Sequence, residues 1–124
     1  MAGTHQGQAL FFNGLTELLQ PSEHKGRAQK IVDAQGASVT LLELAPGQRW
    51  KEHHSVHPII VQVLKGHVRF TVRGQTRTLS PGQVIHLTDH LLHQVDADTS
   101  ATVMVIMLTG ENPDPKVQVP AEQL

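Results

Sequence analysis

The feature that most constrains the fold of this chain is the strict alternation between His67 and Arg73. The odd-numbered positions of this segment are polar or charged, and the even-numbered positions are valine or phenylalanine. A period of two is typical of a β-strand with one face in the core and the other in water. The β-branched run Ile59–Leu64 precedes it and Lys65-Gly66 supplies a turn, so the sequence predicts a β-hairpin here.

Further short apolar segments are separated by turn-forming residues, as in Ala45-Pro46-Gly47 and Ser80-Pro81-Gly82. Short strands with a turn signal every eight to twelve residues, roughly, are typical of all-β sandwiches and barrels. An all-β fold is therefore expected, with one short helical turn at Leu15–Leu19 that Pro21 ends. The other expected strands are Arg27–Asp33, Ser38–Leu44, Thr76–Leu79, Val84–Leu87, His93–Asp96 and Thr102–Leu108.

The chain has 124 residues, which is the usual length of one domain and too short for two ordinary ones. We expect an N-terminal arm at residues 1–36 that packs on a barrel formed by residues 37–110. After Gly110 the sequence contains three prolines and few apolar residues, so residues 111–124 are expected to form an extended C-terminal arm. The three parts together make up a single domain.

The charge and the composition exclude several classes of function. Ten basic and eleven acidic residues leave a net charge of −1, whereas nucleic-acid-binding proteins usually carry a basic excess. The chain has no cysteine, which excludes disulfides, thiolate zinc sites and cysteine nucleophiles. The longest apolar run, Val103–Leu108, is too short to span a membrane, and Met1–Leu10 lacks the pattern of a signal peptide. We therefore expect a cytoplasmic protein that binds neither nucleic acid nor membranes.

The chain has nine histidines, and seven of them lie between His53 and His93. Neutral imidazole is a ligand for zinc, copper, iron and nickel, so two histidine-rich segments in one small β-domain indicate a metal or ligand site. In an extended strand His53 and His57 share a face. Spacing does not decide which of His86, His90 and His93 point inward, because the segment between them is expected to contain a loop.

Two spaced motifs resemble those of the cupin family, whose members are small antiparallel β-barrels of the jelly-roll type. The first family motif is glycine, five residues, His-x-His, three or four residues, glutamate, six residues and glycine. Gly47, His53 and Gly66 fit this spacing. Ser55 stands at the position of the second histidine, and Ile59 stands at the position of the glutamate.

The second family motif is glycine, five residues, proline, one residue, glycine, two residues, histidine, three residues and asparagine. Gly82 and His93 fit this pattern. Thr88, His90 and Ala97 replace the proline, the second glycine and the asparagine. The chain therefore resembles a small cupin in which the metal-binding motifs are degenerate.

The resemblance covers about residues 38–108 and implies a single jelly-roll barrel. Cupins with complete motifs hold a divalent metal with three histidines and one glutamate, so the resemblance implies a metal site in this chain too. His53 and His93 are retained, and His57 is the preferred third ligand. The alternatives for the lost ligands are His54, His86 and His90. The expected ion is zinc, nickel, iron, copper or manganese, and no organic cofactor is expected.

Two functions follow from this interpretation, and the sequence does not choose between them. One is a metal-dependent oxygenase or isomerase, activities that the resemblance implies. The other is a non-catalytic binding or sensory domain that holds a small organic molecule without metal. No acid or base is placed well enough to be named catalytic. The resemblance also implies a homodimer, to which the apolar segments Phe11-Phe12 and Val117–Val119 would contribute.

Overall fold

The computed structural model describes residues 7–53, 56–88, 90–110 and 117–124. Within these ranges the chain consists of strands joined by turns and irregular segments, and no helix is present. The strands are β1 (Arg27–Ala34), β2 (Ala37–Leu44), β3 (Arg49–His53), β4 (Ile59–Lys65), β5 (Val68–Val72), β6 (Gln75–Leu79), β7 (Val84–Leu87), β8 (His93–Asp96) and β9 (Ala101–Leu108). The same ranges contain no helix long and apolar enough to cross a membrane.

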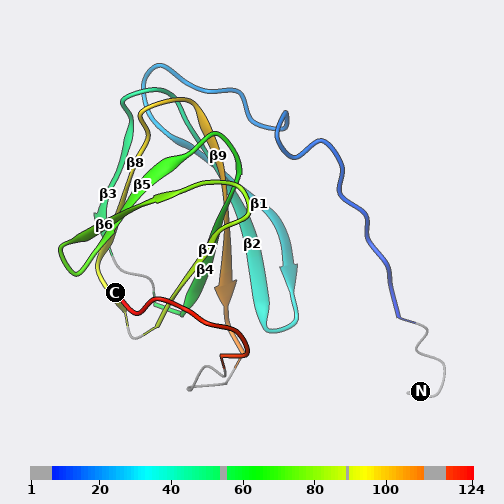
Figure 1. Ribbon diagram of the computed structural model, residues 1–124. Helices are drawn as coiled ribbons and strands as arrows, with labels where there is room; N and C mark the ends of the chain where they lie inside the picture. The colour runs from blue at the N-terminus through cyan, green and yellow to red at the C-terminus, as the bar shows by residue number, and fades with distance from the viewer. Residues whose placement is uncertain (1–6, 54–55, 89, 111–116) are drawn as a thin grey trace.

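The strands form two antiparallel sheets that pack around one core (Figure 1). The five-stranded sheet has the order β1-β2-β9-β4-β7, and the four-stranded sheet has the order β3-β8-β5-β6. Consecutive strands such as β4 and β5 lie in different sheets, so the chain crosses repeatedly from one sheet to the other, as in a jelly roll. The all-β antiparallel jelly roll expected from the sequence is confirmed.

The expected hairpin between Ile59–Leu64 and His67–Arg73 is wrong, although both strands exist. β4 pairs with β7 and β9 in the five-stranded sheet, whereas β5 pairs with β6 and β8 in the four-stranded sheet. The turn at Gly66 therefore carries the chain from one sheet to the other. Alternation shows which side chains share a face, but it does not distinguish strands paired in one sheet from strands that face each other.

The other six expected strands are present, with ends within one residue of those predicted. β3 is an additional strand that was not predicted, because Trp50 is the only large apolar residue in it. The segment Leu15–Leu19 forms a single turn, closed by a hydrogen bond from the Glu17 amide to the Gly14 carbonyl oxygen (3.1 Å), and not a helix. So short a segment before Pro21 does not offset the cost of helix nucleation.

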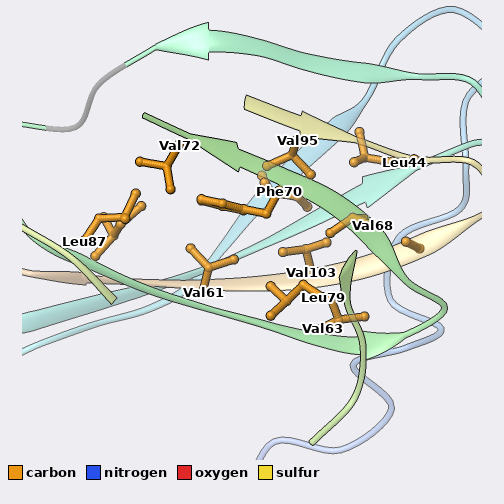
Figure 2. Packing of buried hydrophobic residues seen from close by; sticks show 14 residues of the cluster. Leu44, Val61, Val63, Val68, Phe70, Val72, Leu79, Leu87, Val95 and Val103 are labelled. Carbon is orange, nitrogen blue, oxygen red and sulfur yellow. The ribbon is translucent and has the colours of Figure 1, made fainter. Parts of the chain in front are cut away.

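The core between the sheets is almost entirely aliphatic, with Phe70 near its centre (Figure 2). Figure 2 shows the Phe70 ring between Val95 on one side and Val61 and Val103 on the other. Buried residues alternate with less buried ones along β4 and β5, so the period of two in the sequence is the packing pattern of the barrel. Burial of these side chains is the main driving force for folding.

One end of the barrel, which we call the closed end, is sealed by close packing. Gly66, between β4 and β5, has a φ of +76°, a left-handed conformation that favours glycine. A Cβ atom on Gly66 would lie 2.2 Å from the Ser100 carbonyl oxygen, so a larger residue does not fit without displacement of the backbone. The N-terminal segment also passes this end, where Gly26 packs closely against Leu44 and Trp50.

The two terminal segments differ in how they contact the barrel (Figure 1). β1, which lies in the expected N-terminal arm, pairs with β2, but the segment that begins at residue 7 runs away from the barrel with Phe11 89% exposed. At the C-terminal end of the chain, Leu124 packs against the core. Glu122 accepts two hydrogen bonds from Arg77, with Nε–Oε1 at 3.0 Å and Nη2–Oε2 at 2.9 Å. The described C-terminal residues are therefore held on the barrel, whereas the first described residues extend from it.

Candidate functional site

A shallow, half-open depression with no enclosed volume, which we call the mouth, lies at the end of the barrel opposite the closed end. β4 and β8 begin at this end and β7 ends there, so residues that are distant in sequence meet. The lining residues are His57, Ile59, Leu87, Thr88, His90, Leu91 and His93. Both histidine-rich segments of the sequence therefore contribute imidazoles to one pocket.

His93 has the most buried side chain among the described histidines, at 4% exposed. Its ring stacks on Phe70, with centroids 5.5 Å apart and planes inclined by 6°. Its Nδ1 atom lies 3.0 Å from the Leu91 carbonyl oxygen, which can only accept a hydrogen bond, so Nδ1 carries a proton. In the neutral ring the lone pair is then on Nε2. A backbone carbonyl that orients a histidine in this way is typical of metal ligands.

His53 lies directly opposite His93, in register across β3 and β8. Trp50 pairs with Val95, so β3 has one residue more than β8 between the two pairs, which is a β-bulge. In a regular strand, positions 50 and 53 would lie on opposite faces because they are three residues apart. The bulge therefore brings the two histidines that fit the family motifs into register with each other.

The other candidate ligands differ in their positions. His57 is half-buried in the mouth. His90 also lines the mouth, is exposed, and has a φ of 57°, which is uncommon for a residue other than glycine. His86 lies on β7, is exposed, and places Nδ1 2.9 Å from the Ile59 carbonyl oxygen. The side chain of His53, and His54 and Ser55 entirely, lie outside the described residues.

The donor atoms at the mouth suit some metals better than others. The described lining offers imidazole nitrogens and the Thr88 hydroxyl, and Ile59, 3% exposed, stands where the family motif has a glutamate. Nitrogen donors fit zinc, copper, nickel or iron(II) better than magnesium or calcium, which take oxygen ligands. The described residues contain no group of three His, Cys, Asp or Glu side chains that could hold an ion. A three-histidine site would therefore need a side chain from outside that part, such as His53.

Beneath the mouth the barrel contains a cavity of about 40 Å³. The cavity is lined by Leu42, Trp50, Ile59, Val61, Phe70, His93, Val95, Val103 and Val105. Ile59 and His93 line both spaces, so they form the boundary between the mouth and the cavity. Among these nine residues, His93 alone has an ionisable side chain, and it lies on an otherwise apolar wall.

A network of charged and polar residues lies on the outer face of the four-stranded sheet. Val95 faces the cavity, so the next residue, Asp96, faces outward. The Asp96 carboxylate accepts hydrogen bonds from Arg49 Nε at 2.6 Å and from Gln94 Nε2 at 2.9 Å. Burial raises the pKa of Asp96, but these hydrogen bonds and the charges of Arg49 and Arg69 together hold it below its usual value. The network therefore stabilises the charged form of Asp96 on the side of the sheet away from the cavity.

Comparison with known proteins supports the same fold. The family model described as Cupin domain matches residues 40–109, which is more than half of the chain. An RmlC-like cupin protein from Desulfovibrio desulfuricans has a TM-score of 0.74 and 18% sequence identity, covering 82% of this chain and 98% of that chain. A conserved protein of unknown function from Streptococcus pyogenes has a TM-score of 0.71 and 19% identity, covering 87% of this chain and 95% of that chain.

A cupin superfamily protein from Desulfitobacterium hafniense is similar to the same extent, with a TM-score of 0.71 and 17% identity over 84% of this chain and 94% of that chain. At these identities the likeness shows the fold alone. No curated protein matches the sequence. The match to the family model, together with the jelly-roll topology, confirms the resemblance seen in the motifs: this chain belongs to the cupin family.

Proposed function

We propose that this cupin binds a divalent metal ion through His53, His57 and His93 and holds a small organic ligand at the mouth. The main support is the pairing of positions 53 and 93 in register across β3 and β8, because these are the two positions that the family motifs retain. His57 adds support, since it lines the same pocket as His93. His90 lines this pocket too and is the alternative third ligand.

The chemistry of the mouth favours an anionic ligand. Neutral imidazoles do not offset the charge of a divalent ion, and Ile59 replaces the anionic residue of the family motif. A bound ion would supply Lewis-acid polarisation of a ligand oxygen. The protein orients the His93 ring through the Leu91 carbonyl and the Phe70 stack, and the cavity wall below the ring is apolar. An oxygenase or isomerase activity stays a prediction, and no residue is assigned as catalytic.

The metal content of protein purified without chelator and without nickel resin tests the proposal. We expect about one equivalent of zinc, nickel, copper, iron or manganese per chain, measured by inductively coupled plasma mass spectrometry. His57→Ala and His93→Ala should each lower metal affinity by at least about ten-fold. His24→Ala, an exposed histidine outside the mouth, is the matched control and should leave the affinity unchanged. Protein that takes up no stoichiometric metal from any of these ions contradicts the proposal.

The second candidate is a cupin that binds a small organic molecule without metal. Ile59 favours it, because this buried apolar side chain occupies the position of the family's anionic ligand. In that case His57, His90 and His93 would hold the ligand by hydrogen bonds. The ligand-induced rise in Tm, measured with and without EDTA, separates the two candidates, since only the metal-free binder keeps the rise in EDTA.

We also propose that the protein forms a homodimer. Phe11 and Leu10 are 89% and 59% exposed on the segment that runs away from the barrel, and exposed apolar groups of this kind favour association. Val39, Ile106 and Ile60 form a half-buried apolar row in register on the five-stranded sheet, which a second copy would cover. Sedimentation should give twice the chain mass of 13.6 kDa, and particles of the single-chain mass contradict the dimer. A cytoplasmic location stays a prediction.

A further inference from the structure

The mouth and the cavity beneath it adjoin, and their chemistry differs. Imidazoles from His57, His90 and His93 line the mouth with the Thr88 hydroxyl, whereas eight of the nine residues around the cavity are aliphatic or aromatic. No carboxylate occurs among the described residues that line either space. A ligand that occupies both spaces must therefore have a polar or anionic end and an apolar end.

The size and the wall of the cavity limit the apolar end. Pockets that enclose a whole ligand usually measure about 300–1,000 Å³. This cavity measures about 40 Å³, so it has room for a short apolar group and not for a complete ligand. Its wall includes Trp50 and Phe70, and Ile59 makes its boundary with the mouth apolar. A hydroxyl group placed deep in this space would find few hydrogen-bond partners, so sugar-like groups are disfavoured there.

We propose that the ligand is a small carboxylic acid with a short apolar tail. The carboxylate lies at the mouth, where it ligates the metal or accepts hydrogen bonds from the His57 imidazole and, when Nε2 of His93 also carries a proton, from the His93 imidazolium. The tail enters the cavity and packs against Trp50 and Phe70. This inference rests on the site of the proposed function, but it does not require the metal. It names the ligand class that would be selected by a mouth with no acidic side chain among its described residues, set above a small apolar cavity.

Trp50 makes occupation of the cavity measurable, because it is the only tryptophan of the chain and lines the cavity. In titrations that follow Trp50 fluorescence, the dissociation constants of acetate, propionate and butyrate should fall about four-fold for each methylene that is buried. 4-Hydroxybutyrate should bind about ten-fold more weakly than butyrate, because its terminal hydroxyl would be buried without a full set of partners. Butyramide has the same tail without the charge and should also bind at least about ten-fold more weakly.

A variant that narrows the cavity tests the position of the tail. Val105→Ile adds one methylene to the cavity wall, and Met104→Leu, at the preceding residue of β9, is the matched control on the outer face. We expect Val105→Ile to remove the preference for butyrate over acetate without weakening acetate, and Met104→Leu to keep that preference. Circular dichroism establishes that each variant is folded. Val61→Ile, at another position of the wall, replaces Val105→Ile if that variant does not fold.

The outcomes distinguish this inference from the proposed metal site, because metal content is measured in the same samples. Equal dissociation constants for acetate and butyrate in protein that carries stoichiometric metal overturn the ligand class and leave the metal site standing. A preference for butyrate in protein that takes up no stoichiometric metal supports the ligand class and removes the metal assignment. If none of the acids binds, with or without metal, the inference is overturned.

Discussion

The two ends of the barrel are formed by the same strands, but their residues serve different purposes. At the closed end, Gly66 and the Ser100 carbonyl bring two turns into close contact, and Val68 is fully buried nearby. At the mouth, His57 is half-buried and His90 is exposed, and neither is needed to fill the core. The closed end therefore contributes mainly to stability, whereas the mouth keeps polar side chains that packing does not require.

The first family motif shows the same division between the two ends. Its retained glycines, Gly47 and Gly66, belong to the closed end, where the Gly47 amide donates to the Ala97 carbonyl oxygen at 2.7 Å. Of its two replaced positions, Ile59 lines the mouth, and Ser55 lies outside the described residues. One motif therefore contains glycines that the barrel needs for close packing and positions at the mouth that contribute to the site. A position at the mouth can be replaced while the glycines are kept.

The largest loss of stability is expected for a substitution at the closed end. Gly66→Ala should lower the free energy of unfolding by roughly 3 kcal/mol or more, because the added Cβ would overlap the Ser100 carbonyl oxygen and the backbone φ is +76°. Gly74→Ala is the matched control: φ there is +74°, but nothing lies within 4 Å of the added Cβ. About 1–2 kcal/mol is expected for the control. Urea unfolding measures both, and equal losses would show that the close contact at Gly66 is unimportant.

A smaller effect is expected where the mouth meets the core. His93→Ala should lower the free energy of unfolding by about 2 kcal/mol, because the ring that stacks on Phe70 is lost. His93→Phe keeps a ring at this position and should lower the free energy of unfolding by only about 1 kcal/mol, because the Leu91 carbonyl loses its hydrogen-bond donor. Metal titration of the same samples should show no difference between the two variants. A His93→Phe protein that retains wild-type metal affinity would rule out His93 as a ligand.

The smallest effect is expected on the outer face of the four-stranded sheet. Burial raises the pKa of Asp96, but the hydrogen bonds from Arg49 and Gln94 hold it below its usual value. Such a carboxylate stabilises the folded state above its ordinary pKa, and this contribution is lost as the pH falls through the lower pKa of the folded state. Wild-type protein should therefore lose stability below about pH 4 more steeply than Asp96→Asn does. Parallel pH profiles in urea unfolding would contradict this expectation.

Most of the strands could be predicted because their signals are local. Alternation and turn residues located eight of the nine strands in the described part, and only β3, with a single large apolar residue, gave too weak a pattern. The sheet to which a strand belongs is not a local property. β4 pairs with β9, about forty residues later, and no feature of the Ile59–Arg73 segment reveals that partner.

The candidate site was less predictable for physical reasons. Motif spacing identified His53 and His93, but their pairing depends on a bulge, which the alternation of faces along a regular strand does not reveal. The same alternation placed His57 on the face of His53, whereas residues 56 and 57 form a bend and not a continuous strand. The cavity has no signal in the sequence, because its wall is assembled from six strands, β2, β3, β4, β5, β8 and β9.

In β3, one extra residue decides which residue His53 faces across the sheet. If β3 paired regularly from Trp50 onward, position 52 would lie opposite His93, and His53 would lie one residue beyond it. Deletion of a single codon between Trp50 and His53 would remove the extra residue and keep the two histidines paired without a bulge. Insertion of a codon would move the histidine out of step with His93 unless the bulge took in a second extra residue. In a barrel of this kind, chemistry at the mouth therefore depends on the length of one short edge strand, and an alignment of histidines alone would not detect it.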